Sequence, residues 1–424
     1  MKFKKYMGIM SGIALSLSLV ACGPQENDEA NSDASDTSDN GNVELVVWED
    51  VEKSVGIKDA VAKFEEENDV TVKVVEKAYA QQIEDLRLDG PAGTGPDVLT
   101  MPGDQIGTAV TEGLITELNV AEDVQSIYTD AAMRSQIVDN KVYGLPKAVE
   151  TTMLFYNKDL VAEDELPETL DDWYDYSKEV TDGGNFGFLA LFDQIYYAQS
   201  VMSGYGGYIF GKTEDGGFEA TDIGLNNDGA VEGAQYIQKF YQEGLFPAGI
   251  IGEQGINVLE GLFTEGKAAA IISGPWNIDP FTQAGVNFGV AKLPALSNGE
   301  NMSSFIGVKS YNVSSYSKQA ELAEKLVVFL ANEENSKTRY EVTKEVPAVQ
   351  ALADDPVVAE SEAAKAVAEQ SQFSELMPNI PAMNEVWTPA DAALQTIATG
   401  KAEPKPALDQ AVETIKGQIE AKHQ

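Results

Sequence analysis

Cysteine and histidine are nearly absent from this sequence of 424 residues, which contains one of each. Cys22 alone can form neither a disulfide framework nor a thiolate metal site, and His423 alone gives little basis for histidine-dependent acid–base catalysis. Basic residues are also scarce, because 29 Lys and Arg stand against 69 Asp and Glu and the net charge is −40. Since phosphate contacts need clustered Lys and Arg, this balance disfavours nucleic acid as a partner.

The chain has enough length and apolar content for a folded protein of more than one domain. A single hydrophobic core rarely extends over 424 residues, so we expect two domains. Hydrophobic residues make up 43% of the sequence, which is a normal value for globular proteins and excludes general disorder.

The first residues have the character of a targeting signal. Three lysines among the first five residues precede an apolar run over 7–21 that is too short to span a membrane. The run ends in Leu-Val-Ala-Cys, which resembles a bacterial lipobox and implies cleavage before Cys22 and a diacylglycerol on its thiol. We therefore expect a lipoprotein signal peptide at 1–21, although an ordinary signal peptide with a chance cysteine fits the same residues. The polar residues 22–42 predict a disordered acidic tether.

The next segment alternates strands and helices. Apolar runs at 43–48, 70–74 and 98–101 predict strands, and apolar residues at helical spacing between 57 and 64 predict a helix. A polar helix is expected at 81–89, with a Gly- and Pro-rich loop at 90–97. This order indicates a doubly wound α/β unit.

Further elements follow towards the C-terminus. Thr169 and Asp172 have the spacing of a capping box, and Trp173 behind them is expected to serve packing. We further expect a strand followed by a loop over 187–197, a loop at 204–211, a helix at 225–245, strands at 286–294 and 305–313, and mainly helix at 317–352. A last helix is expected from the apolar stripe Ala407, Leu408, Ala411, Val412, Ile415 and Ile419.

Glu150 is a carboxylate between two apolar, extended pieces, at 143–148 and 153–156. Taken alone, Glu150 fits a solvated loop better than a binding site. More specific is the order of a helix end, Gly-Lys, an apolar strand and Gly-Pro-Trp over 262–276. Two other segments are also distinctive, PDVLTMPGDQIG from Pro96 and MPNIP with a following Trp387.

Together these segments resemble the extracellular solute-binding proteins of sugar ABC transporters, and most closely the maltose/maltodextrin-binding proteins. The resemblance implies an α/β, two-lobed, periplasmic-binding-protein-like fold with a ligand cleft between the lobes and a multi-strand hinge. By this likeness the first lobe comprises 43–149 and 311–355, and the second comprises 150–310 and 356–424.

The resemblance also implies a set of ligand-binding residues, in which acids and a lysine bond hydroxyl groups and aromatic rings stack on sugar faces. These residues are Glu52, Lys53, Met101, Asp104, Glu150, Gln194, Tyr196, Tyr197, Trp276, Met377 and Trp387. For Glu52 and Lys53 a solvated charged loop is the alternative interpretation, and for Trp276 a core position beside a turn. The chain departs from the family pattern where Met101 replaces an aromatic residue, Gln105 an arginine and Gln194 a glutamate; Thr388 and Asp391 replace an aromatic and a basic residue.

The expected function is capture of maltose or maltodextrins, cyclic ones included, by a monomer that is anchored outside the cell membrane only through lipid on Cys22. The partner is then an ABC permease, and no cofactor or catalytic activity is expected. Two alternatives stay open. One is the same fold with another oligosaccharide or a polyol as ligand. The other is a glycosidase that uses Glu150 and Asp104 as its pair of carboxylates.

Overall fold

The structure is a computed structural model that describes residues 43–213 and 217–423. The expected signal peptide, the tether and Cys22 lie outside the described residues. Within the described ranges, no helix combines the length and the apolar character that crossing a membrane requires.

A six-stranded sheet contains the three strands expected near the start of the chain. Strand β1 pairs in parallel with β2 and β3, and β13 joins the sheet antiparallel to β3 and β6. The strands are β1 (Val43–Glu49), β2 (Val70–Glu76), β3 (Val98–Pro102), β6 (Gly144–Glu150), β13 (Phe305–Val313) and β14 (Glu375–Leu376). The three predicted strand positions are therefore confirmed. Leu45 and Val47 of β1 are fully buried beneath the helices, as their alternation with more exposed residues predicts.

A second sheet has four strands in the order β12-β7-β11-β8. These are β7 (Met153–Asn157), β8 (Phe186–Leu189), β11 (Ala268–Ser273) and β12 (Phe288–Ala291). Every residue of β11 is buried, because the strand lies between two others and has helices on its faces.

Helices and short strands complete the two units. Near the six-stranded sheet in sequence are α1 (Lys58–Asn68), α2 (Gln82–Ala92), α3 (Ile106–Thr111), α4 (Glu122–Gln125), α5 (Asp130–Arg134), β4 (Ile137–Val138), β5 (Lys141–Val142), α11 (Ala320–Ala331), α12 (Glu333–Thr343) and α13 (Pro356–Ala359). The others are α6 (Leu170–Val180), α7 (Ile195–Gly204), β9 (Phe210–Lys212), β10 (Phe218–Ile223), α8 (Asp228–Gln242), α9 (Gly255–Thr264), α10 (Ile278–Gln283), α14 (Glu362–Ser371), α15 (Trp387–Ala398) and α16 (Pro404–Lys422).

Two local predictions are confirmed in detail. Thr169 and Asp172 form the expected capping box at the start of α6, and Trp173 behind them is fully buried. Along α16 the residues Leu408, Ala411, Val412, Ile415 and Ile419 are all buried, while Ala407 at the helix start is half-buried.

Two other predictions are wrong about where a helix runs. Helix α2 continues through Gly90 and Pro91, which the sequence assigned to a loop, and ends where Gly93 takes a positive φ of 74°. Helix α7 begins at Ile195, so Tyr196 and Tyr197 are helical and do not lie in a loop. The Ile195 N–H donates to the carboxylate of Asp391, 2.7 Å away. This cap comes from a residue far along the chain, so the local sequence does not reveal it.

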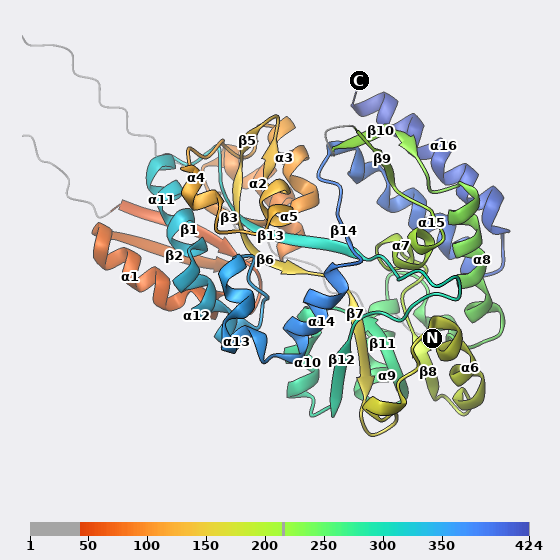
Figure 1. Cartoon of the computed structure of the whole chain (residues 1–424). Helices are drawn as coiled ribbons and strands as arrows, with labels where there is room; N and C mark the ends of the chain where they lie inside the picture. The colour runs from red at the N-terminus through yellow and green to blue at the C-terminus, as the bar shows by residue number, and fades with distance from the viewer. Residues whose placement is uncertain (1–42, 214–216, 424) are drawn as a thin grey trace, which may run out of the picture. The chain divides into compact units, whose positions relative to one another are not determined.

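The chain passes between the two sheets after β6 and again before β13 (Figure 1), and hydroxyl groups join these two segments to the one that leads into β14. Thr151 follows β6, Ser304 precedes β13, and Ser374 precedes β14. The oxygen of Ser304 lies 2.6 Å from that of Thr151 and 2.7 Å from that of Ser374. The lobe boundaries expected from the sequence stay a proposal. In the sheets, the whole of β13 and also β14 belong to the six-stranded unit.

Candidate ligand-binding site

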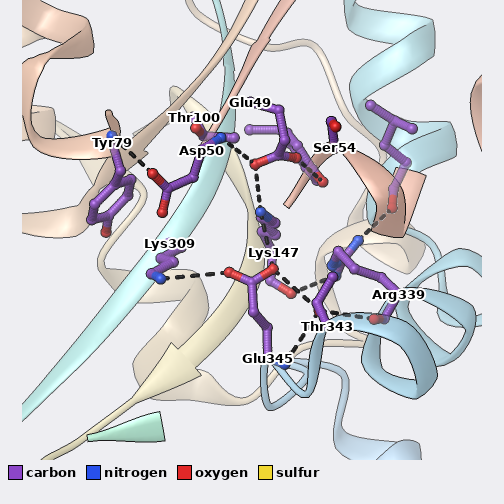
Figure 2. A network of polar contacts seen from close by, with 12 residues as sticks. Glu49, Asp50, Ser54, Tyr79, Thr100, Lys147, Lys309, Arg339, Thr343 and Glu345 are labelled. Carbon is purple, nitrogen blue, oxygen red and sulfur yellow. Dashed lines mark hydrogen bonds and ion pairs between the residues drawn. The ribbon is translucent and has the colours of Figure 1, made fainter. Parts of the chain in front are cut away.

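A chain of buried charges runs from the end of β1 to the end of β6. The Lys147 ammonium lies 2.6 Å from Glu49 and 3.1 Å from Glu345. Lys309 lies 3.5 Å from Glu345 and 3.2 Å from Glu150. Figure 2 shows the Glu345 carboxylate between the two lysines. The five groups thus alternate in sign, which compensates for their removal from water.

Neighbouring side chains complete the buried end of this charge chain. The Tyr311 hydroxyl donates to Glu49 at 3.0 Å. Arg339 donates to the backbone oxygen of Lys147 at 2.6 Å (Figure 2). Burial by itself acts to raise the pKa of Glu345, but the charges of Lys147, Lys309 and Arg339 outweigh it and hold that pKa at about 2. Glu345 is therefore ionised throughout the neutral range.

Lys309 and Glu150 form the end of this row of charged groups that reaches the surface. Burial opposes the charge on Lys309, yet Glu150 and Glu345 together raise its pKa above the ordinary value. Glu150 lies opposite Gly307 in the pairing of β6 with β13. A Cβ atom at Gly307 would stand 3.1 Å from the Glu150 Cγ, so the missing side chain leaves room for this carboxylate to reach Lys309.

Asp104 is a second carboxylate at this place. Its residue is 7% exposed, and among the described residues no other side chain hydrogen-bonds to it. Burial raises the pKa of Asp104 to about 6, and the charge of Glu150 acts in the same direction. A buried carboxylate whose only hydrogen bond among the described residues comes from its own backbone can accept further hydrogen bonds from a ligand.

Tyr79 belongs to this group, although the sequence did not single it out. It lies in a 3-10 turn, Tyr79–Gln81, and its N–H donates to Asp50 at 3.0 Å. The Lys309 ammonium lies 5.0 Å from the centre of its ring (Figure 2). Burial raises the pKa of the Tyr79 hydroxyl well above its ordinary value, with further contributions from Glu150 and Asp104. A Tyr in a polar stretch carries no periodicity that could have marked it.

Aromatic rings, all but one of them from the other unit, adjoin these charged groups. The Tyr196 ring centre is 5.1 Å from that of Tyr197, 6.4 Å from that of Trp276 and 6.1 Å from that of Phe305. Phe305 in turn lies 6.4 Å from Trp387. Four of the five rings were predicted from the sequence. Phe305 was missed because it reads as an ordinary strand residue.

A small hollow connects the two sets of residues. Its walls include Lys53, Glu150, Trp276, Lys309 and Glu345. The hollow has a volume of about 20 Å³, which is room for about one water molecule. The structure thus brings together residues from β6, β13 and the turn at Trp276, which lie far apart in the sequence.

The structure does not support Met101 as a residue that faces the ligand. Its side chain has no exposed surface and packs in a core cluster with Trp48, Leu99 and Ile106. The alternation of β3 explains this position, because Met101 and Leu99 lie on the same face of the strand. Gln105, the other altered residue of that segment, has a buried side-chain oxygen without a partner among the described residues.

The remaining predicted site residues differ in exposure, and among them Lys53 lines the hollow. Lys53 lies 3.9 Å from Asp279 of α10, whereas Glu52 is exposed with a positive φ of 64°. Gln194 is half-buried at the start of α7, where its side chain caps no backbone group. Met377 is 8% exposed and follows β14. Whether these residues contact a ligand remains a prediction.

One segment matches the sequence motif of a phosphate-binding loop but has a different structure. Residues 206–213 read Gly-Gly-Tyr-Ile-Phe-Gly-Lys-Thr, which fits the pattern G-x-x-x-x-G-K-T. In the structure Phe210–Lys212 is strand β9, paired antiparallel with β10. Phosphate cradling needs a loop that opens a helix, so this hairpin lacks the geometry.

Comparisons with known proteins place the chain in a family. Residues 59–366 match the family model described as bacterial extracellular solute-binding protein. A galactooligosaccharide-binding protein of Bacillus subtilis is 72% identical over 99% of this chain and 98% of its own length. A maltooligosaccharide ABC transporter solute-binding lipoprotein of Streptococcus pneumoniae is 33% identical over 99% of each chain.

A solved structure agrees with these relatives. The crystal structure of a cyclo/maltodextrin-binding protein complexed with maltotetraose superimposes with a TM-score of 0.80 at 36% identity, covering 91% of this chain and 100% of the other. The expected two-lobed α/β fold is thereby confirmed. With the family model covering most of the chain and the relatives nearly all of it, this protein belongs to the bacterial extracellular solute-binding proteins.

Proposed function

We propose that this protein captures a neutral oligosaccharide between its two lobes and delivers it to the permease of an ABC transporter. The observation that carries the proposal is the meeting of two kinds of surface. Asp104, Glu150 and Lys309 supply acceptors and donors for hydroxyl groups, and Tyr196 and Trp276 supply flat apolar faces. A sugar ring needs both, because its edges are polar and its faces carry C–H groups.

We further propose a galactooligosaccharide as the ligand. The 72% identity to a protein with that printed ligand covers nearly the whole chain, whereas the maltooligosaccharide and maltodextrin proteins are 33% and 36% identical. The chain also lacks, at Met101 and Gln105, the aromatic and basic residues expected from the maltodextrin-binding resemblance. Maltose or a maltodextrin is the second candidate, since those similarities also extend over nearly the full length.

Binding and release follow from the geometry of the hollow. A space of about 20 Å³ does not admit a sugar ring, so the walls must move apart before a ligand enters. The ligand then favours the closed arrangement, because only there does it touch both surfaces at once. The permease would select this closed form.

Calorimetric titration with galactotetraose and maltotetraose tests the ligand. We expect a dissociation constant at least tenfold lower for galactotetraose. Tighter binding of maltotetraose would make maltodextrin the ligand, and no binding of either sugar would contradict oligosaccharide capture.

The same sugars test the proposal that the protein is not an enzyme. We expect chromatography after long incubation to show both sugars intact. Steady formation of shorter products that stops in Glu150→Gln would instead favour the glycosidase alternative, with Glu150 and Asp104 as its carboxylates.

Attachment through Cys22 is also a proposal, because this residue lies outside the described part of the chain. It rests on the Leu-Val-Ala-Cys sequence alone. In a Gram-positive host, Cys22→Ser should release the protein into the medium or leave it uncleaved. Normal cleavage and continued membrane attachment of the variant would refute the lipid anchor.

A further inference from the structure

We propose that Tyr79 and Lys309 contact the bound oligosaccharide and, with Asp104 and Glu150, form a sub-site for one sugar ring. This inference rests on the proposed function and assigns two residues to it that sequence resemblance did not identify. Tyr79 supplies the aromatic ring of the first lobe that the family resemblance placed at Met101. Met101 itself packs in the core. Lys309 supplies the cation in place of the arginine expected at Gln105.

The first step of the argument is the position of Lys309. Its ammonium lies beside Glu150, 3.2 Å away, and it lines the same hollow as Trp276. An ammonium has three N–H donors, and two carboxylate neighbours leave at least one for a third acceptor. Because both carboxylates favour the charged form, Lys309 stays a donor at neutral pH.

The second step is the unused bonding capacity around Lys309. The Asp104 carboxylate and the Tyr79 hydroxyl have no hydrogen bond from another side chain among the described residues. Both groups lie close enough to Glu150 for its charge to raise their pKa values. A ligand with several neighbouring hydroxyl groups can donate to Asp104 and Glu150 and accept from Lys309 and Tyr79, so all four groups find partners.

The third step is the rigidity of the support. Lys309 lies in the middle of β13 and is held between Glu150 and Glu345, and Glu345 is in turn held by Lys147 (Figure 2). Tyr79 is fixed at its backbone by Asp50. Groups fixed before binding lose little conformational entropy on binding, which favours affinity and discrimination.

The experiment measures dissociation constants for galactotetraose, or for maltotetraose if that sugar binds the wild type more tightly. Tyr79→Ala should bind at least tenfold more weakly, and Tyr79→Phe should lose part of that factor. Lys309→Met should also bind at least tenfold more weakly, with partial recovery in Lys309→Arg. The matched controls are Tyr316→Ala and Lys318→Met, at two exposed residues after β13; both should bind as the wild type does.

Melting temperatures of all variants separate contact from folding. Tyr79 makes no ion pair, so Tyr79→Ala should melt within a few degrees of the wild type. If Lys309→Met does not fold, Lys309→Arg, which keeps the ion pairs, should fold and bind at least threefold more weakly. Unchanged affinity in Tyr79→Ala or in the folded Lys309 variant would overturn the inference.

A Tyr79→Trp variant gives an independent readout. Its fluorescence should change on adding sugar by more than that of the wild type, which has four tryptophans. Absence of any additional change would count against contact at Tyr79. If the wild type binds neither sugar, the proposed function has failed; if it binds and these variants bind equally well, only the sub-site is wrong.

Discussion

The hydroxyl oxygens of Thr151 and Ser304 lie 2.6 Å apart, although 153 positions separate the two residues in the sequence. Both side chains are buried where the chain passes between the sheets. Ser374 continues the contact to the segment that leads into β14. These three segments are therefore joined by hydrogen bonds.

Removing this junction should cost stability. Ser304→Ala leaves Thr151 and Ser374 without their shared partner, and a lost buried hydrogen bond costs about 1–3 kcal/mol. Urea denaturation should show this decrease, while the matched Ser315→Ala, at an exposed serine, should cost less. A Ser304→Ala protein as stable as the wild type would mean that the cluster does not join the segments energetically.

Met101 and the second-lobe tryptophans should respond to truncation in different ways. Trp276→Ala and Trp387→Ala should each weaken oligosaccharide binding by roughly 2 kcal/mol or more, the range of aromatic hot spots. Met101→Ala should instead lower the free energy of unfolding by about 2–5 kcal/mol, because it leaves a cavity in the core. Calorimetry and denaturation of the three variants test the division. A loss of affinity in Met101→Ala without a loss of stability would return Met101 to the cleft.

Gly307 should influence binding without touching the ligand. The added Cβ of Gly307→Ala would stand 3.1 Å from the Glu150 Cγ and force this side chain to shift. We expect at least a threefold weaker sugar affinity with little change in secondary structure. Gly261→Ala, where a Cβ meets nothing within 4 Å, is the matched control. Equal affinities of the two variants would show that the position of Glu150 is not critical.

Glu345 should make stability depend on pH at the acidic end. Its folded-state pKa of about 2 lies below the ordinary value of 4.5, so the ionised group stabilises the folded state above that value. The contribution is lost as pH falls from about 4.5 to about 2. Glu345→Gln should therefore be less stable than the wild type by about 3 kcal/mol at pH 7. Guanidinium denaturation at pH 7, 4 and 2 should show the difference shrinking; a constant difference would contradict the assigned ionisation.

The pKa of Asp104 is shifted in the opposite direction to that of Glu345, so its effect on stability has the opposite dependence on pH. Its pKa of about 6 lies above the ordinary 3.8, so its charged form disfavours folding above about pH 6, and this cost is relieved as pH falls towards 3.8. The carboxylate is nevertheless the better acceptor for sugar hydroxyls. Affinity of the wild type should thus fall between pH 7 and 5, and Asp104→Asn should bind more weakly with a flatter profile. Calorimetry at three pH values measures both, and equally steep profiles would exclude Asp104 as the titrating group.

The sequence predicted those parts of the fold that depend on neighbours along the chain. The strands at 43–49, 70–76 and 98–102 follow from apolar runs, and the α6 capping box follows from two residues three positions apart. Resemblance added Glu150, Tyr196 and Trp276, which the structure brings to one place.

The local sequence did not reveal the contacts between segments that are far apart along the chain. The start of α7 depends on a cap from Asp391. The burial of Met101 depends on which face of β3 packs against the core cluster with Trp48 and Ile106. Lys309 lies beside Glu150 because β13 pairs with β6, and it also lies beside the Tyr79 ring. Periodicity along a chain reflects which side of an element is buried, whereas the register between strands decides which charged groups meet, and that register is set by the packing of the whole sheet.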